Sequence, residues 1–236
     1  MSVVDRILRL PELEAAPPVL VDIGAARGMH PPWRRIAKYS FCVAFEADDR
    51  ELASVMSEAG DFRTLTTYNC LAAEKPSASE TFHLTASPYC SSRLMPRLEQ
   101  LRRYAFAPLF RVERTVDVRA RDVPSVLAEL ELDRVDWLKI DSQGTDLRLL
   151  RSLGTELVRG TLVVELEPGI IDAYEGEDTL AQVLEEMSAW GFWVSELAVR
   201  GSTRIDAELA RRVLGTRASA GYTSEFAPPA SERKRS

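Results

Sequence analysis

Short apolar runs rich in β-branched residues alternate with segments of helical pattern along most of this chain. Several runs are continuously apolar, which is typical of strands that are buried on both faces. Strand–helix alternation of this kind predicts an α/β fold, with a doubly wound parallel sheet covered by helices on both faces. The predicted strands are 19–24, 41–48, 62–69, 81–86, 112–118, 136–141, 161–168 and 192–199. The predicted helices lie near 49–59, 122–132, 143–153 and 178–190.

The length of 236 residues suits one domain, which we place at 19–215. Residues 1–18 precede it as a helical segment, expected to form a short amphipathic helix laid on the domain. Residues 77–114 form an insertion that is a candidate lid. The C-terminal extension 216–236 contains "APPASERKRS", and its Pro, Ser and charge content predicts partial disorder.

Composition narrows the function classes. The formal net charge of −6 and the pI near 5.2 argue against a general nucleic-acid binder, which needs clustered Lys and Arg. No apolar run approaches a membrane span, and the N-terminal residues lack the pattern of a secretory signal. Three cysteines without metal-ligand spacing and only two histidines argue against a metal site. We therefore expect a cytoplasmic protein with reduced thiols and no metal.

The loop after the first predicted strand reads "VDIGAARG" and places Asp22, Gly24 and Gly28 in the spacing D-x-G-x-x-x-G. Gly24 allows a sharp turn and leaves room for a ligand against the main chain. The spacing is not the G-x-G-x-x-G of dinucleotide-binding loops, and no G-K-[ST] of a Walker loop follows. The loop therefore favours a ligand without a pyrophosphate.

The second predicted strand leads to Glu46, 22 positions after Gly24. An acidic side chain there can accept hydrogen bonds from both hydroxyls of a ribose. A ribose without pyrophosphate indicates an adenosyl ligand, most commonly S-adenosylmethionine. The alternative is an ordinary turn in a hydrolase-like or regulatory α/β domain, and this loop alone does not decide between them.

The stretch "VDWLKIDSQGTDLRLLRSL" at 135–153 resembles the hallmark segment of the FkbM-type methyltransferases, which use S-adenosylmethionine. The likeness extends over roughly 19–199. Further motifs that carry it are "VLVDIGAARG", "FEAD", "NCLAAE", the serine pair of "PYCSSRL", and "VVELEP". Members of the family commonly have Glu where this chain has Gln143, and Asn-x-Gly where it has Ala26-Arg27-Gly28.

The resemblance implies a Rossmann-like methyltransferase fold, typically with seven strands of which the last is antiparallel. It also implies O-methylation of hydroxyls, often on sugars of glycans, lipids or secondary metabolites. Adenine recognition is expected after the third strand, where Asn69 is a candidate, although an Asn at a strand end is equally a turn former. The cofactor-binding residues expected on this basis are Asp22, Gly24, Ala25, Gly28, Glu46, Ala47 and Asn69.

Lys139 and Asp141 share one face of the predicted strand 136–141. We expect Lys139 to form an ion pair with Glu165 or Glu167 of the neighbouring strand, in preference to a catalytic role. Asp141 ends its strand beside the expected cofactor site, so it is our first candidate for the base that takes a proton from the acceptor hydroxyl. Its alternative role is to cap the following helix.

Two histidines offer further candidates. His83 is the second candidate base, although a histidine in this pattern is more often exposed on an edge strand. His30 follows the glycine loop and either lines the cofactor pocket or belongs to the Pro-rich entry to a helix.

Six arginines lie between residues 91 and 114, against two glutamates. Guanidinium groups bind phosphates and carboxylates in a bidentate manner. Arg93, Arg102 and Arg103 are therefore candidate ligands for an acidic or phosphorylated acceptor held by a lid. The alternative, which we prefer, is a solvated helix face with intrahelical ion pairs.

The sequence thus predicts an S-adenosylmethionine-dependent O-methyltransferase that acts on a small-molecule or glycan acceptor. Two alternatives remain open: a non-catalytic adenosyl-binding module and a nicotinamide-dependent oxidoreductase. The spacing of the first loop counts against the oxidoreductase.

Overall fold

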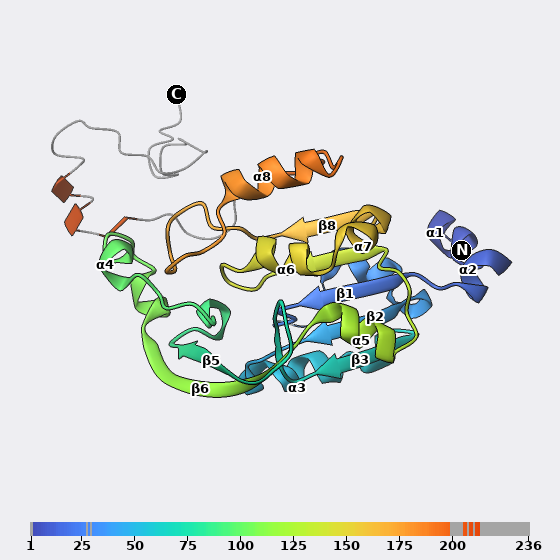
Figure 1. Cartoon of the computed structure of the whole chain (residues 1–236), viewed down its shortest axis with the longest axis horizontal. Helices are drawn as coiled ribbons and strands as arrows, with labels where there is room; N and C mark the ends of the chain where they lie inside the picture. The colour runs from blue at the N-terminus through green and yellow to red at the C-terminus, as the bar shows by residue number, and fades with distance from the viewer. Residues whose placement is uncertain are drawn as a thin grey trace, which may run out of the picture.

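A parallel sheet forms the centre of the computed structural model (Figure 1). The structure describes residues 2–26, 28, 30–198, 205–206, 208–209 and 211–212. Within them the strand order is β3-β2-β1-β7-β8, and every neighbouring pair is parallel. The order reverses between β1 and β7, so the binding crevice expected of such a sheet lies beyond the carboxyl ends of these strands. The strands are β1 Val19–Ile23, β2 Phe41–Phe45, β3 Thr64–Tyr68, β7 Trp137–Ile140 and β8 Val163–Leu166.

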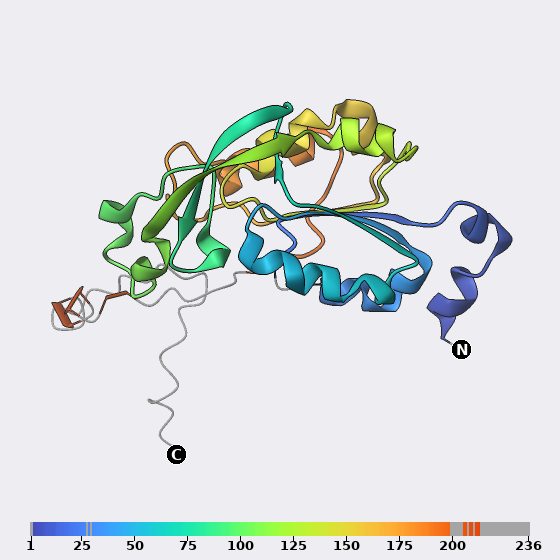
Figure 2. The ribbon, with the colours of Figure 1, turned by 90° about the horizontal axis from the view of Figure 1, so that it is seen from below.

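Helices cover both faces of this sheet; Figure 2 shows α5, α6 and α7 on one side and α3 on the other. On the first side Val21, Val43 and Leu138 pack against apolar residues of α5 and α6. On the second side Leu20 and Cys42 pack against Trp33 of a short 3-10 helix. Burial on both faces explains why the strands read as continuous apolar runs. The helices of the domain are α3 Asp49–Ser57, α4 Leu98–Leu101, α5 Val123–Glu129, α6 Asp146–Ser152, α7 Thr155–Gly160 and α8 Leu180–Ala189.

Helix starts follow local capping chemistry. Asp48 and Asp122 cap α3 and α5, because their side chains accept from the backbone N–H groups of Arg50 and Ser125. A capping box between Thr179 and Gln182 begins α8. The 3-10 helices are η1 Pro31–Arg35, η2 Ala37–Tyr39, η3 Ala59–Asp61, η4 Pro88–Cys90 and η5 Ala107–Phe110.

A second, three-stranded sheet has the order β4-β6-β5. Its strands are β4 Leu71–Ala72, β5 Ser77–Thr85 and β6 Val112–Arg121, and the β5–β6 pair is antiparallel. The predicted insertion 77–114 therefore contains β5, the start of β6 and, between them, the excursion formed by residues 86–111, which includes α4. Phe82, Leu84 and Ala120 form a small core with Leu71. This sheet brings the excursion towards the strand ends of the main sheet, as the contacts of Ser91 and Ser92 show below.

The N-terminal segment forms two short helices, α1 Val3–Ile7 and α2 Pro11–Ala15, which lie at one end of the domain (Figure 1). Polar contacts attach them: the Asp5 carboxylate accepts from the Tyr39 hydroxyl at 2.6 Å and pairs with Lys38. Ile7 and Leu10 remain exposed. The predicted helical segment is thus present as two short helices, with Val4 and Leu8 half-buried and a carboxylate contact to the domain.

Two predictions differ from the structure. The described residues give the main sheet five strands, so the seven-stranded sheet is not confirmed. The predicted strand 192–199 is wrong over its described part 192–198, which contains no strand and exposes 80% of Trp193.

The C-terminal extension 216–236 lies outside the described residues. No helix in the described part of the chain has the length and apolar character needed to cross a membrane.

Candidate active site

The carboxyl ends of β1, β2 and β7 meet at Gly24. Its N–H donates to the carbonyl of Phe45 at 3.0 Å, and the N–H of Asp141 donates to the carbonyl of Ile23 at 2.9 Å. Gly24 has φ +76°, and a Cβ at this position would lie 2.1 Å from the carbonyl oxygen of Asp141. Only glycine therefore allows β1 to turn here while it touches the end of β7.

The rest of the glycine loop packs closely onto α3. Ala25 is buried, and its N–H also donates to the Phe45 carbonyl, at 3.2 Å. Gly28 has φ +79°, and a Cβ there would lie 2.7 Å from the carboxylate of Glu58. The cavity that Asp22, Ala25 and Gly28 help to line holds only about 10 Å³, room for at most one water molecule. This cavity is too small for a ligand of adenosyl size.

The first charged pair of the site is Asp22 with Lys139. The Lys139 Nζ lies 2.8 Å from Asp22 Oδ1, and both side chains are largely buried. Burial by itself lowers the pKa of Lys139, but the charges of Asp22 and Asp141 outweigh it and the pKa is raised. The expected pair of Lys139 with Glu165 or Glu167 is thus wrong.

Glu165 of β8 is in register with Lys139, but its carboxylate contacts other side chains. Its Oε1 lies 2.9 Å from His30 Nε2 and accepts from the Trp137 indole N–H at 2.7 Å. His30 is buried, with edge contacts to Trp33 and Trp137. These contacts show that His30 packs against one face of the sheet.

Glu46 follows β2 directly and is 6% exposed. Its Oε1 accepts from the N–H of Asp48 at 2.8 Å. Its Oε2 is buried and has no hydrogen-bond partner within the described part of the chain. Burial raises the pKa of Glu46 to about 7, against the opposing effect of the Asp48 hydrogen bond. A buried carboxylate oxygen without a donor is costly, so this atom fits a ligand that brings hydroxyl donors.

The two remaining predicted cofactor residues lie beside Glu46. Asn69 follows β3, and its amide donates to the Glu46 carbonyl at 3.3 Å and to the Asp49 carboxylate at 2.9 Å. Ala47 is half-buried against the core of the second sheet. The structure therefore groups Asn69, Ala47 and Glu46 at the ends of β2 and β3.

An ion-paired network that the sequence analysis missed joins this group to the insertion. Asp48 is buried and pairs with Arg50, whose Nη2 lies 2.6 Å from Asp48 Oδ2. Arg50 also donates to the Thr85 carbonyl and to the Ser91 hydroxyl, both at 3.1 Å. The signals were Asp48 in "FEAD" and the serine pair in "PYCSSRL", but nothing in the sequence indicated their contact. The network fixes the start of the excursion next to Glu46.

Asp141 ends β7, and its Oδ1 accepts a hydrogen bond from the Gln143 amide. Burial, with the nearby charge of Glu167, raises the pKa of Asp141 to about 7. The capping role proposed for Asp141 is wrong: Thr145 is the N-cap residue of α6. Asp146 instead organises this turn, because its carboxylate accepts from the N–H groups of Ser142 and Glu167. The carboxylate of Asp141 is therefore not the cap of α6.

His83 lies near the end of β5 and is 8% exposed, so the expectation of an exposed edge position is wrong. Ser92 covers this edge through a backbone bridge with His83, at 2.8 and 3.2 Å. The His83 Nδ1 lies 3.1 Å from the Thr115 hydroxyl. Ser92 in turn donates from its hydroxyl to the Gln143 carbonyl at 2.8 Å. His83 is therefore linked to the Asp141 loop through Ser92.

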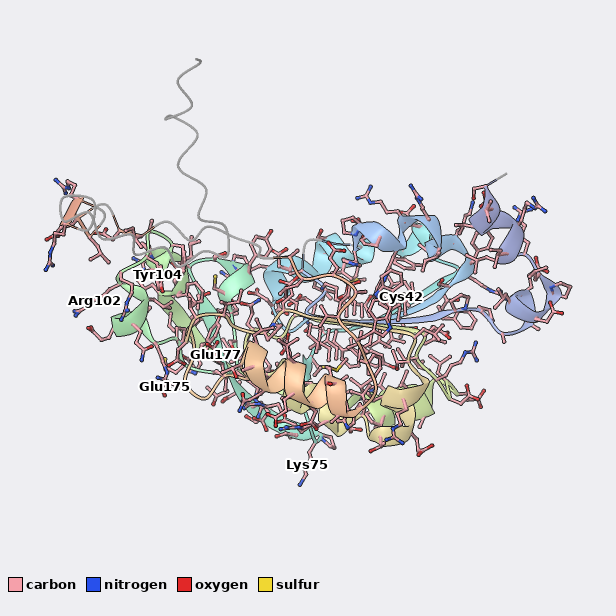
Figure 3. The ribbon with its side chains drawn as sticks, turned by 90° about the horizontal axis from the view of Figure 1, so that it is seen from above. Cys42, Lys75, Arg102, Tyr104, Glu175 and Glu177 are labelled. Carbon is pink, nitrogen blue, oxygen red and sulfur yellow. The ribbon has the colours of Figure 1, made fainter. Side chains whose placement is uncertain are left out.

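The predicted acceptor-binding arginines are not brought together. Arg93 forms an ion pair with Glu74. Arg102 pairs with Glu99 one helical turn away, with 78% and 87% of their side chains exposed. Figure 3 shows Arg102 pointing outward, well away from Cys42 of the central sheet. This arrangement favours the solvated helix face over the lid.

Replacing Arg102 and Arg103 together with Ala is therefore expected to change the KM for an acceptor by no more than about twofold, because exposed ion pairs contribute little. Steady-state kinetics of the double variant check this, with Lys75→Ala as a control that removes a positive charge at another exposed site. A clear rise in KM at unchanged kcat, seen only in the arginine variant, would support the lid instead.

The site therefore combines a tight glycine turn, a buried Glu46 whose Oε2 has no partner among the described residues, and the buried Asp141 carboxylate of raised pKa. Among the described residues no group of three or more His, Cys, Asp or Glu side chains is placed to hold a metal ion. Comparison with known proteins gives one result: the sequence model of the methyltransferase FkbM domain matches residues 22–194. No curated protein and no solved structure matches the chain. The match begins in β1 and extends beyond α8, so it includes the glycine turn, Glu46 and Asp141, and the chain belongs to the FkbM methyltransferase family.

Proposed function

We propose that this methyltransferase uses S-adenosylmethionine to methylate a hydroxyl group, on a sugar, glycan or secondary metabolite. The observation that carries the cofactor assignment is the buried Oε2 of Glu46 at the carboxyl end of β2, which has no partner within the part of the chain that the structure describes. Ribose hydroxyls are donors that would satisfy this atom. Three buried cysteines that form no disulfide among the described residues agree with a reducing compartment, and we propose the cytoplasm.

Residues around Glu46 account for the rest of such a ligand. The turn at Gly24 lies against the end of β7, and we place the methionine moiety of the ligand beside this turn. Asn69 lies beside Glu46, where its amide can reach an adenine edge. The cofactor supplies an electrophilic methyl group bound to a sulfonium.

Asp141 is the residue we assign to the acceptor. A hydroxyl is a poor nucleophile until its proton is removed, and a carboxylate whose pKa lies near the working pH is an effective base. The pKa of Asp141, raised to about 7 by burial, meets this condition. His83 is the second candidate, but its ring is held by Thr115 and reaches the Asp141 loop only through Ser92.

Calorimetric titration with S-adenosylhomocysteine, beside NAD, tests the cofactor assignment. We expect binding of the adenosyl ligand, no binding of NAD, and an affinity loss of about tenfold to hundredfold in Glu46→Gln, because the amide has no charge and keeps only one acceptor oxygen. Glu12→Gln, exposed on α2, is the matched control. Equal affinities of Glu46→Gln and wild type would contradict the assignment.

The same titration has an expected pH dependence. The ionised carboxylate accepts both hydroxyls, and the pKa of free Glu46 is about 7. Affinity should therefore fall by about tenfold from pH 8 to pH 6 in the wild type, as Glu46 takes up a proton. The Glu46→Gln variant should show no such dependence. Binding that is independent of pH in both proteins would show that Glu46 does not hold the ribose.

Turnover separates an enzyme from a non-catalytic module with the same fold. We expect methyl transfer from S-adenosylmethionine to hydroxylated acceptors in a screen of sugars and glycosides. Tight cofactor binding without transfer to any acceptor would favour the module.

A further inference from the structure

Gln143 has an unusual backbone conformation next to Asp141. Its φ is +56°, in the left-handed region that residues other than glycine seldom adopt. Strain of this kind persists only where surrounding contacts enforce it, and it often marks a functional site. The question is what holds Gln143 in this position.

Three hydrogen bonds fix Gln143. The Ser92 hydroxyl donates to its carbonyl at 2.8 Å, and the Tyr174 hydroxyl donates to its Oε1 at 3.1 Å. Its own Nε2 donates to Asp141 Oδ1. Because the ionised Asp141 carboxylate can only accept, the Nε2 end of the amide faces it, and Oε1 is left on the side of Tyr174.

The groups that hold Gln143 are themselves immobile. Ser92 is fully buried and bound through the main chain to His83. Tyr174 is 3% exposed, and its hydroxyl also lies 2.9 Å from the Cys90 carbonyl. A Cβ on Gly144 would lie 3.1 Å from Glu177 Cβ, so the residue after Gln143 packs closely against the segment that carries Tyr174. Gln143 is therefore held on one side by Ser92, which bridges to β5, and on the other by Tyr174 in the segment after β8.

The charges around Asp141 explain why such a clamp matters. Glu167 after β8 and Asp146 of α6 place negative charge near its carboxylate, and Lys139 of β7 places positive charge there. Tyr174 faces the same group as a neutral hydroxyl. Within this set Gln143 is the neutral donor in direct contact, and a hydrogen bond to the charged form favours ionisation.

We propose that Gln143 is a positioning residue that orients the Asp141 carboxylate and favours its ionised form for proton transfer from the acceptor. The proposal rests on the proposed function, in which Asp141 is the base. Gln143 leaves one carboxylate oxygen of Asp141 for the acceptor by occupying the other. Tyr174 and Ser92 act through Gln143.

Three variants separate positioning from a merely structural role. Gln143→Gly removes the donor but suits the left-handed backbone, so we expect an unchanged or higher Tm with kcat lower by about tenfold or more. Gln143→Glu places a second carboxyl against Asp141, so the acid limb of the kcat profile should move to higher pH by about one unit or more. Tyr174→Phe should show a smaller loss, because the amide is then free to turn. In all three, KM and the affinity for S-adenosylhomocysteine should stay near wild type.

A second measurement does not depend on knowing the acceptor. Carbon NMR of the Asp carboxyl groups, with the Asp141 signal assigned by its loss in Asp141→Asn, gives the pKa directly. We expect a higher pKa in Gln143→Gly and Gln143→Glu than in the wild type. Equal pKa values, or a Gln143→Gly variant with wild-type kcat, would overturn the proposal. Failure of the wild type to bind S-adenosylhomocysteine would instead overturn the proposed function.

Discussion

Replacing Lys139 with Met is expected to lower the free energy of unfolding by about 3–5 kcal/mol, because it leaves Asp22 buried without its counter-charge. Asp22 is 3% exposed and lies 2.8 Å from the Lys139 ammonium. The methionine fills most of the volume of the lysine stem, so the loss comes mainly from the unpaired charge. Urea denaturation at pH 7–8 measures it, a range in which Lys139, with its raised pKa, is protonated in the wild type.

Two controls make this result specific. Lys38→Met breaks the surface pair with Asp5, in which 60% of the lysine side chain is exposed, and should cost little. The double variant Asp22→Leu with Lys139→Met removes both charges, and apolar residues in place of a buried pair are often neutral or stabilising. We therefore expect the double variant to recover most of the loss. A double variant as unstable as Lys139→Met would show that the lysine stem, and not the charge, supports the sheet.

Which strand lies beside which could not be predicted from local sequence patterns. Alternation placed Lys139 on one face of its strand, and this is confirmed. In the sheet, Lys139 is in register with Asp22 of β1 on one side and Glu165 of β8 on the other. The choice between them depends on Trp137 and His30, which bind Glu165. No local pattern predicts that contact, because His30 is 135 residues from its partner.

The strand ends were predictable, and the contacts around them were not. Buried apolar runs located the strands before Glu46 and Asp141, since burial on both faces leaves a strong signal. His83 was misjudged because β5 looks like an edge, whereas Ser92 returns to cover it. Trp193 shows the opposite error: an apolar, aromatic run reads as a strand, yet it is exposed and irregular in the described part 192–198. Both cases depend on which segment returns to a sheet edge, a long-range property.

The link between cofactor side and acceptor side also arises only in three dimensions. Asp48 and Arg50 hold Ser91 beside Glu46, and the next residue, Ser92, donates to the carbonyl of Gln143. The serine pair thus joins the end of β2 to the loop after β7. The sequence indicated each motif, but their spacing of about 40 to 50 residues carried no information about contact.

Replacing Asp141 with Asn is expected to lower kcat by about 10²- to 10⁴-fold, the usual contribution of a general base. The amide has the shape of the carboxylate and still accepts from Gln143, but it cannot take the proton of an acceptor hydroxyl. Affinity for S-adenosylhomocysteine should stay near wild type, because Glu46 holds the ribose in our proposal. In the wild type, kcat should rise with pH through about 7, the pKa of Asp141.

Stability should move in the opposite direction to activity. The pKa of Asp141 is raised from 3.8 to about 7 on folding, so the folded protein binds its proton more tightly than the unfolded chain. Wild-type stability therefore falls as pH rises from about 4 to about 7, and Asp141→Asn escapes this loss. At pH 8 the variant should unfold at a higher urea concentration than the wild type while it transfers methyl groups far more slowly. If Asp141→Asn is more stable than the wild type but keeps a near wild-type kcat, Asp141 is not the base and His83 remains the candidate. The cost of ionising the buried Asp141 carboxylate would then have a reason other than proton transfer.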